Sequence, residues 1–293
     1  MRVGVVFPQT EIGNDPGVIR EFAQAVEELG YQYLLAYEHV VGAPPDRLRE
    51  LGVPRPPYTH ESPFHEPFVL FGYLSAVTSK LELTTGIVIL PQRQTVLVAK
   101  QAAEVDVLSR GRLRLGVGLG WNPVEYEALG EDFRNRGRRV EEQITLLRLL
   151  WTQELVDFEG RYHRVRRAGL NPLPVQRPIP IWMGGSADRA LRRIARIADG
   201  WISQLAPSPQ AAEVLDRVRG YVWEAGRDPD RFGLEGRVHL GTTPADRWPE
   251  AVRIWKELGG THLSVNTMRS GFRTPQEHLE ALRHFREALS GLL

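Results

Sequence analysis

The sequence predicts an α/β fold, a (β/α)8 TIM barrel with insertions at its C-terminal face. Three observations support this prediction. About eight apolar, strand-like runs alternate with helical patterns along the chain. The length of 293 residues, without a linker-like stretch, favours one large domain (residues 1–293) over the rival doubly wound open sheet. A composition of 42% hydrophobic and 25% charged residues is sufficient for a full core.

Short apolar runs bounded by turn residues mark the expected strands. Such runs are typical of parallel strands that are buried on both faces. In chain order they are Val3–Phe7, Tyr33–Tyr37, Leu83–Leu90, Leu113–Val117, Ile179–Met183, Gly200–Ser203, Arg237–Gly241 and His262–Val265.

The helices between these runs begin with recognisable capping signals. A capping residue followed by proline, which suits the first helical position, occurs at Asp15-Pro16, Ser208-Pro209 and Thr274-Pro275. Glu277 adds a capping box to the last of these starts. Apolar residues recur at helical spacing after each start, for example between Val18 and Leu29.

Two segments interrupt the alternation of strands and helices. Residues 40–66 follow the second expected strand and are rich in proline, arginine and aromatic residues. Residues 152–177 contain a second insertion, in which residues 158–163 indicate a small hairpin. Long insertions in compact domains are usually binding loops, lids or interface elements. Because the first insertion leaves the carboxyl end of a barrel strand, we expect it to form a substrate lid.

The charge balance and the absence of cysteine narrow the classes of function. Lys+Arg 37 against Asp+Glu 36 gives a net charge of +1, so nothing indicates nucleic acid or an anionic membrane as a partner. Zero cysteines exclude disulfides, a thiol nucleophile and cysteine-ligated metals. The chain reaches Pro8 too early for a signal peptide and has no run of membrane-spanning length, so we expect a cytoplasmic protein.

Glu38-His39, at the carboxyl end of the second expected strand, is the first candidate site. An acid beside an imidazole can transfer protons, and barrel active sites lie at this end of the strands. The structural alternative is that His39 satisfies a buried loop carbonyl. His60 and His65 resemble a zinc-protease motif, but five positions and Pro63 separate them, so no metal site is expected there.

Glycines occur within or at the end of three other expected strands. Gly86 indicates either a bulge that approaches a ligand or tight packing. The run Gly116–Gly120 lacks the Rossmann pattern and instead indicates a flexible strand end that places Trp121 at the barrel mouth. Gly184-Gly185-Ser186 leads into a helix whose N-terminus can hold a phosphate, with arginines such as Arg192 on the next turns. An ordinary serine N-cap is the alternative for Ser186.

Longer segments of the chain resemble the signature of a known family. They are Leu90–Arg93, Ala99–Arg112, Leu115–Trp121 with Glu125, Pro178–Gly185 and Ala198–Trp201. These segments resemble the bacterial luciferase-like monooxygenase superfamily, most closely its branch that uses the deazaflavin coenzyme F420 rather than FMN. The similarity extends from Val3 to about Trp201 and more loosely beyond.

The resemblance implies a TIM barrel that binds a flavin-type ring at its C-terminal mouth. It implies a non-prolyl cis peptide matched by Gly86-Ile87, and a phosphate site matched by Gly184-Gly185 with Arg192 nearby. Glu38-His39 match an Asp-His pair that lies near the reactive ring carbon. The catalytic glutamate of the family's sugar-phosphate dehydrogenases falls near Gly120-Trp121, where this chain has no acid, so the resemblance argues against that activity.

We therefore expect an oxidoreductase that transfers a hydride between coenzyme F420 and a small organic substrate. The expected roles are proton transfer by His39 with Glu38, ring contacts by Gly86, Ile87, Gly120 and Trp121, phosphate binding by Gly184, Gly185, Ser186 and Arg192, and substrate cover by Tyr58 and Phe64. An FMN-dependent two-component monooxygenase served by a reductase, or a non-catalytic flavin-binding protein, are the alternatives. Arginine-rich helices are compatible with a homodimer. The sequence leaves the substrate and the direction of hydride transfer open.

Overall fold

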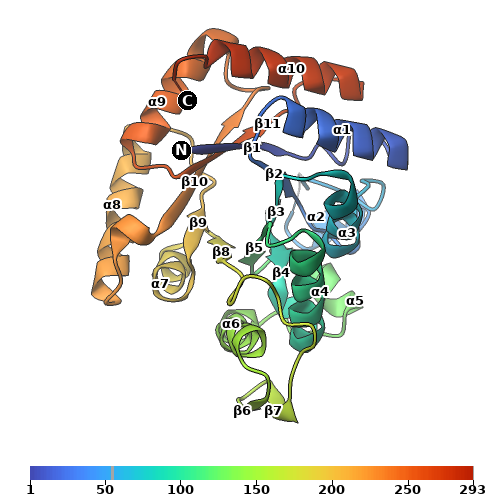
Figure 1. Cartoon of the computed structure of the whole chain (residues 1–293), viewed down its shortest axis with the longest axis vertical. Coiled ribbons are helices and arrows are strands. Elements are labelled where there is room, and N and C mark those ends of the chain that lie inside the picture. The colour runs from blue at the N-terminus through green and yellow to red at the C-terminus, as the bar shows by residue number, and fades with distance from the viewer. Residues whose placement is uncertain (54–55, 293) are drawn as a thin grey trace.

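Parallel strands close into an eight-stranded barrel in the computed structural model, which describes residues 1–53 and 56–292 (Figure 1). Their order is β3 (Glu82–Thr85), β2 (Tyr33–Ala36), β1 (Arg2–Val6), β11 (His262–Asn266), β10 (Gly233–His239), β9 (Gly200–Ile202), β8 (Ile181–Gly184) and β5 (Leu113–Gly118), which pairs with β3 again. The predicted barrel is confirmed. The expected domain 1–293 and the first insertion both include positions outside the described residues.

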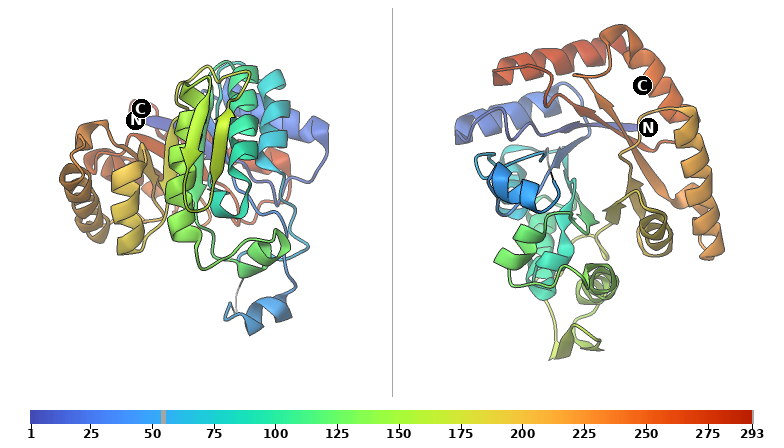
Figure 2. Two further views of the ribbon diagram at one scale, coloured as in Figure 1. Left: turned by 90° about the horizontal axis from the view of Figure 1, so that it is seen from below. Right: turned by 180° about the vertical axis from the view of Figure 1, so that it is seen from behind.

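Helices surround the barrel on all sides (Figures 1 and 2). They are α1 (Pro16–Glu28), α3 (Pro67–Val77), α4 (Thr95–Leu108), α6 (Arg136–Thr152), α7 (Asp188–Ile197), α8 (Pro209–Glu224), α9 (Trp248–Glu257) and α10 (Pro275–Ala288). The predicted caps of α1, α8 and α10 are confirmed, because Asp15, Ser208 and Thr274 each accept a hydrogen bond from a backbone N–H of the first turn.

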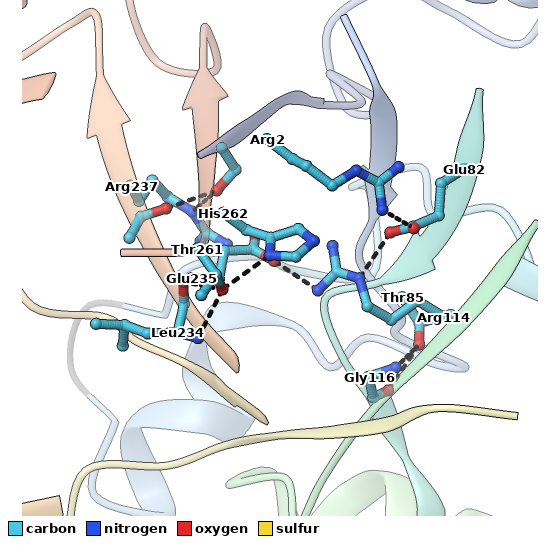
Figure 3. Close-up of polar contacts among 12 residues, drawn as sticks. Arg2, Glu82, Thr85, Arg114, Gly116, Leu234, Glu235, Arg237, Thr261 and His262 are labelled. Atoms are coloured by element: carbon cyan, nitrogen blue, oxygen red, sulfur yellow. Dashed lines mark hydrogen bonds and ion pairs between the residues drawn. The ribbon is translucent and has the colours of Figure 1, made fainter. Parts of the chain in front are cut away.

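Charged side chains fill the barrel at the end where its strands begin (Figure 3). Arg114 of β5 donates to Glu82 of β3 at 2.7 Å and to Glu235 of β10 at 2.8 Å. Its guanidinium also lies over the rings of Tyr33 and Trp182, at 4.9 and 4.3 Å from their centroids. These two carboxylates raise the pKa of Arg114 against the opposing effect of burial. This network closes the N-terminal end of the barrel, so a ligand must enter from the opposite end.

The third expected strand is interrupted in its middle. Instead of one strand over Leu83–Leu90, the chain forms β3, a break at Gly86-Ile87, β4 (Val88–Ile89) and a 3-10 turn. The Thr85 hydroxyl bridges the break, because it donates to the Gly116 carbonyl at 2.6 Å and accepts from the Gly116 N–H at 2.9 Å (Figure 3). A Cβ on Gly116 would lie 2.0 Å from the Thr85 carbonyl oxygen, so only glycine fits there.

The peptide between Gly86 and Ile87 is trans, contrary to what the family resemblance implies. Among the described residues, the cis peptides precede Pro172 and Pro178. A Cβ on Gly86 would lie 2.1 Å from Leu35 Cδ2, so packing against β2 is what excludes a side chain here. The predicted irregularity of the chain is therefore present, and the predicted isomer is wrong.

Both predicted insertions lie outside the barrel. The first carries α2 (Pro45–Glu50), which projects beyond α5 (Pro123–Ala128) in the left view of Figure 2. The second forms an antiparallel hairpin of β6 (Val156–Glu159) and β7 (Arg164–Ala168), as predicted, and it extends below α6 in Figure 1. Because the first insertion follows β2, it leaves the barrel at the carboxyl end of a strand.

The seventh expected strand begins earlier than predicted. It was expected over Arg237–Gly241, whereas β10 begins at Gly233. A Cβ on Gly233 would lie 2.1 Å from the Trp182 ring, so this glycine leaves space for the indole inside the barrel.

Within the part of the chain that the structure describes, no helix has the length and hydrophobicity needed to cross a membrane.

Candidate active site

A histidine and a buried glutamate meet at the carboxyl end of β2. His39 Nδ1 lies 3.2 Å from Glu125 Oε2, and the other oxygen, Oε1, accepts a hydrogen bond from the Val40 N–H at 2.7 Å. Glu125 is fully buried in α5, which Asn122 caps and Pro123 starts. An ionised carboxylate only accepts hydrogen bonds, so it selects the His39 tautomer that carries its hydrogen on Nδ1. His39 Nε2 is then the nitrogen that is left to exchange a proton with a ligand.

Tyr58 of the first insertion completes this cluster. Its ring stacks on His39 with centroids 3.6 Å apart, and its hydroxyl donates to Glu125 at 3.1 Å while accepting from Asn122 Nδ2 at 2.7 Å. Burial raises the pKa of Tyr58, which keeps the phenol protonated as a donor. The insertion is thus joined to the same carboxylate that orients His39.

Aromatic side chains continue outward from Tyr58. Phe64 meets the His39 ring edge-on with centroids 4.8 Å apart, and Trp121 meets Tyr58 at 5.7 Å. Trp121 is 37% exposed, as expected for a residue at the barrel mouth. Tyr58, Phe64 and Trp121 therefore lie together around His39, although they come from two separate loops.

Glu38 has different neighbours from its sequence partner His39. Arg93 donates to its carboxylate from Nε at 2.6 Å, and the Ile89 N–H donates to its other oxygen. Burial raises the pKa of Glu38, while the Arg93 guanidinium opposes that shift. These contacts tie the end of β2 to β4. The carboxylate that contacts His39 is therefore that of Glu125, and not that of Glu38 as the sequence suggested.

A pocket of about 480 Å³ opens beside this pair. It lies between the N-terminal ends of α3 and α4, and Glu38, His39, Phe64, His65, Gln92 and Arg93 are among its lining residues. Gln92 is 2% exposed, and neither polar atom of its amide has a partner among the described residues. His65 Nε2 is likewise buried without a partner in that part of the chain. Burial lowers the pKa of His65, which favours its neutral form. Such groups are typical of a site that awaits a polar ligand.

The turn between β8 and α7 lies close to the interrupted third strand, because only β5 separates β8 from β4 in the sheet. The Ile87 side chain lies close to the ends of β5 and β8. A Cβ on Gly118 would lie 2.7 Å from it, and a Cβ on Gly184 would lie 3.3 Å from it. Gly185 has a φ of +150°, and its carbonyl accepts from Trp201 Nε1 at 2.8 Å. The floor of the mouth here consists of Ile87 and bare main chain.

The cap of α7 differs from the alternative weighed for Ser186. The N-cap is Ala187, without a side-chain hydrogen bond, and Ser186 is exposed. The first N–H groups of α7 are therefore not satisfied by a capping side chain, which is the arrangement that suits an anion.

Arg192 does not point to this turn. Its Nε donates to Asp188 at 3.0 Å, and its guanidinium lies 3.9 Å from the centroid of the Tyr221 ring of α8. Arg192 is therefore held toward α8, and its role in binding phosphate stays a prediction. Arg189 and Arg193 line a pocket together with Ala187 and Ala190 instead, on the side that faces the turn.

Comparison with known proteins places this architecture in a family. The model of the luciferase-like monooxygenase family matches residues 1–290. The chain belongs to this family. The resemblance noted in the sequence is thereby confirmed over nearly the whole length of this luciferase-like protein.

Individual relatives match this luciferase-like protein over only part of its length. An uncharacterised protein of Mycobacterium tuberculosis is 41% identical over 165 residues, which cover 56% of this chain and 57% of that protein. The match thus spans little more than half the length of that relative. An F420-dependent glucose-6-phosphate dehydrogenase of Nakamurella multipartita is 31% identical over 252 residues, or 83% of this chain and 69% of that protein.

Solved structures share the fold of this luciferase-like protein at low sequence identity. An F420-dependent secondary alcohol dehydrogenase in complex with an F420-acetone adduct has a TM-score of 0.80 at 16% identity, covering 100% of this chain and 99% of that one. The monooxygenase RslO1 from Streptomyces bottropensis has a TM-score of 0.78 at 20% identity, with the same coverage.

Glu125 is the main site residue that reasoning from the sequence did not assign. It contributes to the family resemblance, but the expected catalytic acid was sought near Gly120-Trp121. The α5 turn carries this acid from a position four residues beyond Trp121 to the His39 ring. A glutamate in the first turn of a short helix after a strand end was the available signal.

Proposed function

We propose that this protein is an oxidoreductase that transfers a hydride between coenzyme F420 and a small organic substrate. The observation that carries the proposal is the His39–Glu125 pair, oriented at the carboxyl end of β2 beside a pocket with unpartnered polar groups. Relatives that use F420, at 31% and 28% identity, support this choice of coenzyme. When bound, the deazaflavin supplies hydride chemistry that no protein side chain can perform.

The mouth of the barrel has features that fit a planar ring. Ile87 with Gly118 and Gly184 would form its floor, since the two glycines carry no side chain above the main chain. The turn Gly184-Gly185-Ser186 would hold the phosphate with the free N–H groups of α7. Gly120 and Trp121 would border the open face of the ring.

The role of His39 would be to exchange one proton with the substrate oxygen or nitrogen through Nε2. Glu125 would act as a positioning residue, because it holds Nδ1 and stabilises the imidazolium when His39 is protonated. Tyr58 and Phe64 would exclude water from the imidazole. Glu38 would maintain the strand end through Arg93 and take no proton itself.

The test combines reconstitution with a matched pair of variants. Purified apoprotein is titrated separately with F420 and FMN, and turnover is then followed on a panel of alcohols, aldehydes and enones. His39→Ala should lower turnover about 100-fold or more while leaving coenzyme affinity within threefold. His60→Ala, which removes an exposed histidine of the same insertion, should leave both unchanged. Micromolar affinity for FMN with none for F420 would overturn the proposal.

An FMN-dependent two-component monooxygenase is the second candidate. The similarity in fold to the monooxygenase RslO1 favours it. Oxygen consumption with reduced FMN from a reductase, coupled to substrate hydroxylation, would establish this activity. Tight coenzyme binding without turnover on the panel, and unaffected by His39→Ala, would instead establish a non-catalytic flavin-binding protein.

A further inference from the structure

An arginine-rich pocket of about 600 Å³ lies next to the β8–α7 turn. The segment before α6, the turn of the β6–β7 hairpin and the first turn of α7 form its walls, and Leu119 connects it to the end of β5. Six arginines line it: Arg134, Arg136, Arg138, Arg161, Arg189 and Arg193. We call these residues the arginine pocket.

The positive charge of the arginine pocket is mostly uncompensated. Of its six arginines, only Arg193 has a carboxylate within 4.0 Å in the described part of the chain, namely Glu141 at 2.7 Å. Asp132 is the one acidic residue in its lining, and its carboxylate accepts from the Arg134 backbone N–H. In a molecule with a net charge of only +1, five unpaired guanidinium groups around one cavity form a strong local field.

One wall of the arginine pocket is held in place. Arg136 Nη1 donates to the Phe133 carbonyl at 2.7 Å, and its guanidinium lies 3.6 Å from the Phe133 ring centroid. Its Nε is buried and has no partner within residues 1–53 and 56–292. Arg193 is 7% exposed and fixed by Glu141. A ligand that enters would therefore meet guanidinium groups that are already ordered, which lowers the entropic cost of binding.

We propose that the arginine pocket binds a chain of several linked carboxylates, the oligoglutamate tail that coenzyme F420 carries beyond its phosphate and that FMN lacks. This inference rests on the proposed function. The Gly184–Ser186 turn lies next to the pocket through Ala187 and Ala190, so a phosphate at the turn would direct the tail into the pocket. One phosphate needs one or two arginines, whereas five unpaired guanidinium groups match several carboxylates, which arginine binds bidentately.

Two binding measurements test this inference without any turnover. The first titrates apoprotein with F420 of two, four and six glutamates, and with the ring and ribityl chain alone. The second titrates apoprotein with a free oligo-γ-glutamate peptide at low and high salt. The pocket variant is Arg134→Gln/Arg138→Gln/Arg161→Gln. The control, Arg166→Gln/Arg253→Gln/Arg283→Gln, removes the same charge from exposed arginines elsewhere.

The expected result is an affinity that rises with the number of glutamates and falls with salt. The pocket variant should lose about tenfold or more in affinity for the longest tail and for the peptide, and should bind the ring alone as the wild type does. The control variant should stay within threefold for every ligand. Equal losses in both variants, or an affinity that does not depend on tail length, would overturn the inference. Binding of the ring alone with no tail effect leaves the proposed function standing, whereas failure of every deazaflavin to bind overturns both.

Discussion

A single carboxylate, that of Glu125, holds three groups at the candidate active site. It accepts from the Val40 N–H and the Tyr58 hydroxyl, and it lies beside His39 Nδ1. Val40 and Tyr58 belong to the first insertion and His39 directly precedes it, so the carboxylate holds residues that are far from α5 in the sequence. Because Glu125 is fully buried, loss of its charge cannot be replaced by water.

We expect Glu125→Gln to change the proton exchange of His39 and not the binding of coenzyme. The neutral amide no longer stabilises the imidazolium, so kcat should fall about 10- to 100-fold. Coenzyme affinity should remain within threefold. Glu127→Gln on the same helix removes an exposed carboxylate and is the control. An unchanged kcat in Glu125→Gln would show that this carboxylate serves stability alone.

His262 links the barrel interior to acid sensitivity. Burial, together with the nearby Arg114 and Arg2, lowers its pKa to about 2. The unfolded chain therefore binds a proton below pH 6.5 that the folded chain does not bind, so stability must fall as the pH drops below 6.5. The limiting slope for one such histidine is about 1.4 kcal/mol per pH unit. Urea unfolding between pH 7 and 4.5 measures how the free energy of unfolding depends on pH. This dependence should be less steep in His262→Gln than in the wild type, by the equivalent of about one proton. Identical pH dependences would contradict the assignment.

At the scale of secondary structure, the break in the third strand depends on Gly116. Its missing side chain lets the Thr85 carbonyl approach, and the Thr85 hydroxyl then replaces the lost pairing between strands. Gly116→Ala must displace main chain and should lower the free energy of unfolding by about 3 kcal/mol. Gly220→Ala in α8, where a Cβ meets nothing within 4 Å, should raise it by up to about 1 kcal/mol. Denaturant unfolding checks both, and a mild effect at Gly116 would show that the break is flexible.

Elements defined by local signals could be predicted, and those defined by distant contacts could not. The caps at Asp15 and Thr274 depend on residues within one helical turn, and the structure confirms them. The break in the third strand depends on Gly116, which is 31 residues from Thr85. The start of β10 was missed because Glu235 appears polar in the sequence, whereas its carboxylate is buried against Arg114.

The same division applies to the candidate site. His39 was found because barrel topology places strand ends at the mouth, whereas its partner Glu125 is 86 residues away. The direction of Arg192 depends on Tyr221 in a neighbouring helix. Sequence reasoning could therefore name the end of the barrel and several of its residues, but the pairing between loops required the folded chain.

At the scale of the whole molecule, one outer helix of the barrel lacks charge. Helix α3 contains no charged residue, and its neighbour α4 exposes Val96 and Leu97. Val69 is 72% exposed. A helix that is apolar on all sides is usually covered. We propose that a second copy of the chain covers α3 and α4, since no charge on this helix would oppose the approach of an identical surface.

Light scattering with size-exclusion chromatography tests this proposed dimer. The wild type should elute with twice the mass of the chain at micromolar concentration. Val69→Glu/Leu97→Glu should elute as a monomer, because a dimer would have to bury the two introduced carboxylates in its interface. Trp223→Glu, which changes a 73% exposed side chain on α8, should remain dimeric. A wild type that is monomeric at these concentrations would refute the interface.

The contact between Tyr58 and Glu125 has a consequence for the order of events during a catalytic cycle. Tyr58 belongs to the first insertion, yet it donates to the carboxylate that orients His39 and covers the imidazole with its ring. If the insertion moves aside to admit a molecule, the Tyr58 ring no longer covers His39, and the Glu125 carboxylate loses the Tyr58 hydroxyl in the same movement. Entry of a molecule and proton exchange at His39 then cannot occur at the same time, so the reaction begins only after the insertion has closed again.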